Sequence, residues 1–204
     1  MSDDRRIAVV DDVAAVRASL KALLETYGYG IELYDSADAF FAGIADTGLS
    51  CVLFDVRMPG MSGLEAQRLL SVKAPWLPVI IITGHGDIDM AVGAMKEGAF
   101  DFIEKPIDDE KLISSIAVAV GRAEEAKAQA RKRALILSKY ERLTSRERDV
   151  MRLVAEGYST IAIASMLAIS VRTVDHHRAS IHAKMEVTSL PQLIKLALEI
   201  EHAT

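Results

Sequence analysis

Short apolar runs alternate with amphipathic segments over the first part of the chain. Runs with the length and composition of buried strands lie at residues 7–10, 31–34, 51–54, 78–83 and 100–104. Between them, apolar residues recur every three or four positions, which is typical of helices packed on one side. Strands that alternate with helices predict an α/β fold with a doubly wound, five-stranded parallel sheet. Burial of that sheet on both faces explains the uninterrupted strand runs.

The segment after the fifth run has the composition of a long helix. Residues 122–133 are dominated by Ala, Glu, Lys, Gln and Arg, with no Pro or Gly. A helix from Asp108 to about Tyr140 would exceed the usual globular length, so it either continues as a linker or breaks near Gly121. We favour a largely helical linker over residues 122–142.

From Leu143 onward the apolar spacing is helical throughout. Thr144 or Ser145 is expected to cap a first helix, residues 160–167 form a second, and Ser170 and Ser189 cap a third and a fourth. Four short helices in about 60 residues predict an all-α bundle that contains a helix-turn-helix unit. The expected domains are therefore residues 5–121 and 143–204, joined by the linker.

Charge follows the same division of the chain. The net charge is −5 overall, but residues 1–121 carry −9, residues 122–142 carry +4 and residues 143–204 carry 0. The single cysteine, Cys51, excludes an intramolecular disulfide and suits a core position in a reducing compartment. No apolar run approaches the length of about 20 residues needed to span a membrane, and the N-terminus lacks a secretory signal. We expect a cytoplasmic protein without a membrane partner.

Acidic residues gather where the first and third strands end. Asp11 and Asp12 follow one apolar run, and Asp55 ends another. In open α/β sheets this edge carries the chemistry, and three like charges are unfavourable there unless a hard cation such as Mg²⁺ binds. Asp55 can then act as a nucleophile that forms an aspartyl phosphate. Thr83 and Lys105 end the fourth and fifth strands and can supply a hydroxyl and a positive charge.

Each of these residues also has an ordinary structural interpretation. Asp12 alone can cap the following helix, Asp55 alone can be a loop acid, and Lys105 alone can be a solvated lysine. All of them at successive strand ends form a far more specific pattern.

The stretches VVDD, LFDVRMPG, IIITG and FIEKP resemble the signature of the response-regulator receiver domain, whose fold is flavodoxin-like. The resemblance implies that Asp55 is the phosphoacceptor. It also implies a Mg²⁺ site formed by Asp11, Asp12, Asp55 and the backbone carbonyl of Arg57. Thr83 and Phe102 would be switch residues. Lys105 would bind the phosphoryl group, and a cis Lys105–Pro106 peptide bond would place the lysine. Arg57 and His85 would tune the phosphate lifetime, or would simply be loop residues at the pocket rim.

The stretch from LTSRE through ISVRTV resembles the LuxR-type DNA-binding domain, and the whole chain resembles a FixJ-type regulator. One departure is the apolar Ile161, which is expected to be exposed. In the third helix of this domain, Val174, Ile181 and Met185 share one side at 100° per residue and should face the core. The opposite side should enter the major groove of promoter DNA.

Candidate DNA contacts come from that helix. Asp175 can accept from cytosine, Ala179 can contact a thymine methyl, and His176 lies on the same side. The phosphate candidates are Arg172, Thr173 and Lys184. Arg178 either contacts DNA or pairs with an acid such as Glu147.

The resemblance implies a transcription regulator whose partners are a sensor histidine kinase, double-stranded promoter DNA and RNA polymerase. Phosphorylation would promote homodimerisation, DNA binding and, we expect, activation of transcription. It is not expected to be an enzyme beyond Mg²⁺-dependent self-phosphorylation and self-dephosphorylation. The alternatives are a DNA-binding regulator independent of phosphorylation and an aspartyl-phosphate hydrolase. The hydrolase is disfavoured because the chain shows neither a second acid for turnover nor a cap over the site.

Overall fold

A computed structural model describes residues 5–44, 48–84 and 88–201. The described residues up to Lys127 form one compact unit, and those from Ala128 onward form a second. Each unit has its own buried hydrophobic core. Within the described ranges, no helix is both long and apolar enough to cross a membrane.

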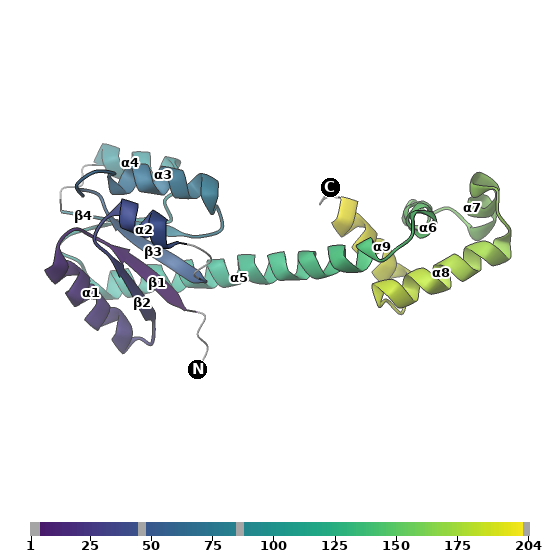
Figure 1. Cartoon of the computed structure of the whole chain (residues 1–204), viewed down its shortest axis with the longest axis horizontal. Coiled ribbons are helices and arrows are strands. Elements are labelled where there is room, and N and C mark those ends of the chain that lie inside the picture. Colours follow the sequence, from purple (N-terminus) through teal and green to yellow (C-terminus); the bar gives the residue numbers. More distant parts are fainter. Residues whose placement is uncertain (1–4, 45–47, 85–87, 202–204) are drawn as a thin grey trace. The chain divides into compact units, whose positions relative to one another are not determined.

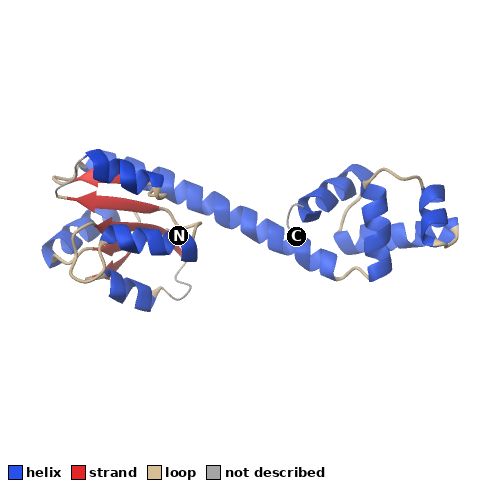
Figure 2. Ribbon diagram, turned by 90° about the horizontal axis from the view of Figure 1, so that it is seen from above, coloured by secondary structure: helices blue, strands red, loops and turns tan. Residues whose placement is uncertain are grey.

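The first unit is built on a five-stranded parallel sheet (Figures 1 and 2). Its order is β2-β1-β3-β4-β5, with every neighbouring pair parallel. The strands are β1 (Arg6–Val10), β2 (Gly30–Tyr34), β3 (Leu49–Asp55), β4 (Val79–Thr83) and β5 (Asp101–Glu104). The predicted sheet is confirmed, and β1 and β3 are neighbours. The acidic residues that follow these two strands therefore share one edge of the sheet.

Helices cover both faces of this sheet (Figure 2). Leu20 and Leu24 of α1 and Leu112 and Ile116 of α5 belong to the core on one face. The other core contains residues of α2, α3 and α4. Every residue of β3 is buried, as expected for a central strand between two layers. The helices of this unit are α1 (Ala14–Thr26), α2 (Ala37–Gly43), α3 (Gly63–Lys73), α4 (Ile88–Lys96) and the first part of α5 (Asp109–Glu141).

Helix α5 continues through Gly121 without a break, which confirms the helical connector. The first unit nevertheless extends beyond the boundary expected at residue 121. Ala123 is buried, and Lys127 Nζ donates to the carbonyl oxygen of Gly48 at 3.0 Å and lies 5.5 Å from the ring centre of Trp76. These contacts attach the helix to the start of β3 and to the α3–β4 loop.

The second unit contains α6 (Ser145–Ala155), α7 (Thr160–Leu167), α8 (Val171–Met185) and α9 (Leu190–Glu201), together with the end of α5. Thr144, Ser159 and Ser170 cap the first three through side-chain oxygens. Val174, Ile181 and Met185 of α8 are buried, as their spacing predicted. The α/β receiver fold followed by an all-α domain is thus confirmed.

The turn between α7 and α8 is made by a residue in the left-handed region. Ala168 has φ 53° and ψ 47° and forms the C-cap of α7, with its N–H donating to the carbonyls of Ala164 and Ser165. An L-residue with a Cβ is disfavoured in this conformation by roughly 1 kcal/mol, whereas glycine is not.

Ala168→Gly is therefore expected to stabilise the second unit by up to about 1 kcal/mol, because the cap keeps its hydrogen bonds and loses its strain. Urea unfolding followed by circular dichroism would measure the change. The matched control is Ala179→Gly in the middle of α8, which should destabilise the unit by about 1 kcal/mol. Equal destabilisation by both changes would contradict the assignment of strain to Ala168.

Candidate functional site

Two buried carboxylates share one ammonium group at the carboxyl edge of the sheet. Asp11 follows β1, and Asp55 ends β3; they are 2% and 8% exposed. Lys105, which follows β5, donates from Nζ to Asp11 Oδ2 at 2.8 Å and to Asp55 Oδ1 at 2.6 Å. Three residues far apart in the sequence therefore meet because their strands end at the same edge.

Backbone donors hold the other carboxylate oxygens. Asp11 Oδ1 accepts from the N–H of Val13 at 2.8 Å, and Asp55 Oδ2 accepts from the N–H of Arg57 at 2.7 Å. Both bonds are made within the loop that follows each strand, so the loop conformation orients each carboxylate. Asp55 thus has one oxygen bound to the lysine and the other bound to its own loop.

Lys105 is the charge partner of this acidic pair. Burial lowers the pKa of its ammonium group, but hydrogen bonds to Asp11 and Asp55 outweigh burial, so its pKa is raised overall. Its backbone N–H also donates to the carbonyl oxygen of Thr83 at 2.7 Å, and the Lys105–Pro106 bond is cis, as the resemblance implied. Lysine and threonine are therefore linked through adjacent strands.

Asp12 differs from this pair in exposure. It is exposed, and the N-cap of α1 is Val13 without a side-chain hydrogen bond, so the interpretation of Asp12 as the helix cap is wrong. Among the residues that the structure describes, no three acidic, histidine or cysteine side chains are close enough to hold a metal ion. The donor chemistry of Asp11 and Asp55 still suits Mg²⁺, because both offer hard carboxylate oxygens that already share a cation.

The remaining predicted residues of the first unit differ in exposure. The Thr83 side chain is buried at the end of β4, and Phe102 of β5 is half-buried against the core that contains α3 and α4. Arg57 is exposed at the rim, and His85 lies outside the described residues. The suggestion that Arg57 and His85 tune phosphate lifetime stays a prediction.

Gly63, which the sequence did not single out, packs closely against the backbone of Asp55. A Cβ on Gly63, the first residue of α3, would lie 2.1 Å from the backbone oxygen of Asp55 and 2.9 Å from its carbonyl carbon. The Gly63 N–H donates to the carbonyl oxygen of Val56 at 3.1 Å. The close approach of α3 to β3 needs a residue without a side chain, and its sequence signal was the glycine three residues after Gly60.

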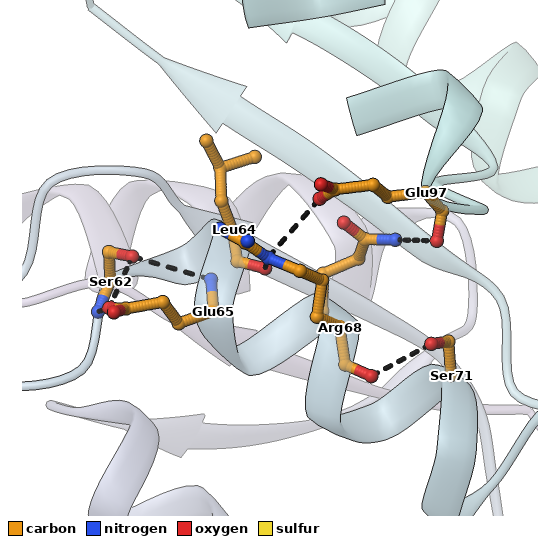
Figure 3. A network of polar contacts seen from close by, with 7 residues as sticks. Ser62, Leu64, Glu65, Arg68, Ser71 and Glu97 are labelled. Carbon is orange, nitrogen blue, oxygen red and sulfur yellow. Dashed lines mark hydrogen bonds and ion pairs between the residues drawn. The ribbon is translucent and has the colours of Figure 1, made fainter. Parts of the chain in front are cut away.

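Helix α3 is fixed at its start and near its middle by polar contacts (Figure 3). Ser62 and Glu65 form a reciprocal capping box at its start. Further along, Gln67 Nε2 donates to the carbonyl oxygen of Glu97 at 2.7 Å, and Arg68 Nε lies 3.2 Å from the Glu97 carboxylate. These contacts hold the C-terminal end of α4 against α3.

Helix α8 presents the predicted polar face of the second unit. Arg172, Asp175, His176 and Ala179 are exposed. Thr173 is partly buried, and its hydroxyl lies 2.7 Å from that of Ser170. In α7, Ile161 is 73% exposed, which confirms the expectation for this apolar residue.

Two other candidate residues of α8 are bound within the unit. Arg178 Nη1 donates to the Thr160 hydroxyl at 2.9 Å, so the suggested pair with Glu147 is wrong. Glu147 instead accepts from Lys184 Nζ at 2.7 and 2.9 Å and from the Ser180 hydroxyl at 2.6 Å. Lys184, predicted to contact phosphate, therefore has an internal partner.

Burial raises the pKa of Glu147, but hydrogen bonds from Lys184, Ser180 and Thr144 outweigh burial and lower its pKa to about 2. Glu147 as a whole residue is 4% exposed. Glu147 is therefore a buried, charged carboxylate whose two oxygens both accept hydrogen bonds.

Comparison with known proteins agrees with the division into two domains. Residues 7–117 match the family model of the response regulator receiver domain, and residues 141–197 match that of the bacterial regulatory proteins of the luxR family. This chain is a two-domain response regulator. It is a FixJ-like transcription regulator with a LuxR-type DNA-binding domain.

Relatives of this response regulator match it over nearly its whole length. The transcriptional regulatory protein FixJ of Bradyrhizobium diazoefficiens is 40% identical over 97% of both chains. The response regulator protein TmoT of Ectopseudomonas mendocina is 39% identical over 93% of this chain and 86% of its own. The solved structure of the response regulator StyR is 35% identical, with a TM-score of 0.88 over 96% of this chain and 99% of its own.

Gly63→Ala in this response regulator is expected to destabilise the receiver by about 1–3 kcal/mol, because the new methyl group would overlap the Asp55 carbonyl and move α3 or β3. Thermal unfolding followed by circular dichroism would measure the loss. The matched control is Gly93→Ala on α4, where a Cβ meets no atom within 4 Å. That change should be neutral or stabilising, and a loss of stability equal to that of Gly63→Ala would contradict the close-approach argument.

The DNA-binding domain should lose stability in acid through Glu147. Its folded pKa of about 2 lies below the ordinary value of 4.5, so its stabilising contribution is complete above pH 4.5 and is lost as the pH falls toward 2. A shift of this size corresponds to about 3 kcal/mol as an upper bound. Unfolding of wild type and Glu147→Gln at pH 7 and pH 3 would test this: the difference between the two proteins should shrink at low pH. A constant difference would contradict the linkage.

Proposed function

We propose that a partner histidine kinase phosphorylates Asp55, and that this promotes dimerisation and sequence-specific promoter binding that activates transcription. The observation that supports this most directly is the buried pair of Asp11 and Asp55 around Lys105. A carboxylate oriented by one backbone N–H and one lysine is positioned as a nucleophile at the edge where α/β sheets carry their chemistry.

In the proposed transfer, an oxygen of Asp55 forms a bond to phosphorus while the phosphorus–nitrogen bond of the kinase phosphohistidine breaks. Lys105 provides positive charge for the phosphoryl oxygens, since its Nζ already lies 2.6 Å from Asp55 Oδ1. Hydrolysis of the acyl phosphate by water returns Asp55 to the carboxylate, so turnover is limited to self-phosphorylation and self-dephosphorylation.

A bound Mg²⁺ would supply charge neutralisation for the phosphoryl oxygens. Asp11, Asp55 and the carbonyl of Arg57 would hold it, with Asp12 turned toward the site. Receiver domains generally use this ion. In the present arrangement the Lys105 ammonium group offsets one of the two negative charges of the buried carboxylates.

Thr83 and Phe102 are the proposed switch residues. Thr83 ends the strand next to Asp55, and its backbone carbonyl is bonded to Lys105, so a phosphoryl group at Asp55 would lie beside both. The repacked surface of α4, β5 and α5 would then form a homodimer. The phosphoryl group must bind this active arrangement better than the inactive one.

In the second domain, α8 is the proposed DNA-reading helix. Arg172 and Thr173 would contact phosphates, while Asp175, His176 and Ala179 would contact bases. A dimer on two half-sites would compensate for the zero net charge of residues 143–204. The DNA-bound dimer would act on RNA polymerase.

Asp55→Asn is expected to abolish phosphorylation and the responses that depend on it, because the amide cannot form the acyl phosphate. Wild type treated with an acyl-phosphate donor and Mg²⁺ should dimerise and bind promoter DNA about 5–150-fold more tightly. The variant should stay at the unphosphorylated level. Light scattering and fluorescence anisotropy would measure the two responses.

The control is Glu25→Gln, a similarly conservative change at an exposed acid of α1. It should behave as wild type. If Asp55→Asn retains the phosphate-dependent gain, the mechanism is wrong. If wild type binds DNA equally well with and without the donor, a phosphorylation-independent regulator is favoured. Continuous release of phosphate from an organic phosphate would favour the hydrolase.

A further inference from the structure

We infer that Glu147 is a positioning residue for DNA recognition, which acts through Ser180 and Lys184 to set the rotation of α8, and that Lys184 serves this purpose and does not bind phosphate. The inference rests on the proposed DNA-reading role of α8. Glu147 lies on α6, outside the helix that reads DNA, and it is the only acid among the buried polar residues described in this unit.

The contacts of Glu147 join two helices. Its carboxylate accepts from the backbone N–H of Thr144 at 2.7 Å, which fixes it at the start of α6. The same carboxylate accepts from Ser180 and Lys184 of α8. Ser180 and Lys184 are four residues apart, so they lie on the same side of α8. One carboxylate therefore holds about one helical turn of α8 against the start of α6.

This contact lies on a flank of α8. At 100° per residue, Ser180 and Lys184 lie about 80° and 120° from Arg172, which is on the exposed face. Arg178 lies about 120° from Arg172 on the other flank and donates to Thr160 of α7 at 2.9 Å. Polar contacts to α6 and to α7 thus hold opposite flanks of the helix, while apolar residues fill the side facing the core.

Two such contacts restrict rotation of α8 about its own axis more than apolar packing alone. Apolar contacts are non-directional, whereas a carboxylate that accepts a hydroxyl and an ammonium group has a defined geometry. Base recognition requires side chains in fixed positions, so a small rotation of α8 would misplace residues such as His176 and Ala179. Loss of Glu147 should therefore reduce specific binding more than non-specific binding.

The alternative role for Lys184 makes the opposite prediction. If Lys184 binds a phosphate, Glu147 competes for it, and Glu147→Gln would leave DNA affinity unchanged or raise it. Lys184→Met would then weaken binding to every sequence and reduce the slope of log affinity against log salt by about 0.9. If Lys184 acts through Glu147, Glu147→Gln weakens specific binding and the salt slope stays constant.

The test uses the full chain and two DNA probes: a duplex selected from random sequences by the wild-type protein, and a mixed-sequence duplex. The proteins are wild type, Glu147→Gln, Lys184→Met and the double variant, in which both charges are removed together. Affinity is measured over a series of salt concentrations, at a temperature where circular dichroism shows each protein folded. Glu156→Gln, an exposed acid at the end of α6, is the matched charge control.

We expect Glu147→Gln and the double variant to bind the selected duplex about tenfold more weakly, comparable to the loss of one base contact. Their affinity for the mixed-sequence duplex and their salt slopes should match wild type. The loss in the double variant should be smaller than the sum of the losses in the two single variants, because both changes remove the same contact. Lys184→Arg should restore specific binding, since it keeps the ion pair.

Unchanged or tighter binding by Glu147→Gln, or a reduced salt slope in the double variant, would overturn the inference. If Glu147→Gln does not fold, Ser180→Ala replaces it. That variant removes a single hydrogen bond and should weaken specific binding about threefold, and wild-type specificity in it would also overturn the inference. If wild type selects no duplex, the proposed DNA-binding function is itself contradicted, and the role of Glu147 falls with it.

Discussion

The receiver depends on one electrostatic constraint: two buried carboxylates around a single ammonium group. Asp11 and Asp55 are nearly inaccessible to water, and two like charges at this depth would be strongly unfavourable without a cation. Lys105 supplies that cation from the end of β5, so three strands must end at the same edge of the sheet. The parallel order β2-β1-β3-β4-β5 satisfies this requirement because β1 and β3 are adjacent. The charge arrangement of the site therefore depends directly on the order of the strands.

The same arrangement connects Asp55 to the neighbouring strand ends. Lys105 interacts with both carboxylates, so a change of charge on Asp55 would change the relative strength of the ion pairs that Lys105 makes with Asp55 and Asp11. Its backbone N–H is also bonded to Thr83, so a shift of the lysine loop acts on the end of β4. On the opposite side, the close approach of Gly63 to the Asp55 carbonyl leaves β3 little freedom to move. A change at Asp55 would therefore act first on the contacts of Lys105 with Asp11 and with the backbone of Thr83.

Much of this could be predicted from the sequence. The five apolar runs located the strands because a central parallel sheet needs uninterrupted apolar segments. Because parallel strands end at the same edge of a sheet, the sequence also predicted that Asp11, Asp55, Thr83 and Lys105 lie at one edge. Features set by atomic contacts could not be predicted: the spacing of Gly63 three residues after Gly60 does not by itself predict a close approach, which appears only where α3 meets β3. Similarly, Gly121 suggested a domain boundary, but burial of Ala123 and the contacts of Lys127 extend the first unit along α5.

The second unit shows a different limit of sequence analysis. Periodicity correctly assigned Val174 and Ile181 to the core, since burial depends mainly on which side of α8 a residue occupies. Periodicity does not assign the partners of charged residues on the flanks of a helix. Lys184 was expected to contact DNA, and Arg178 either to contact DNA or to pair with an acid; each has a partner on a neighbouring helix. A small domain with one buried carboxylate must satisfy that carboxylate internally, because an unpaired buried charge costs several kcal/mol. The need to satisfy Glu147 therefore takes precedence over the contacts that Lys184 would otherwise make at the surface.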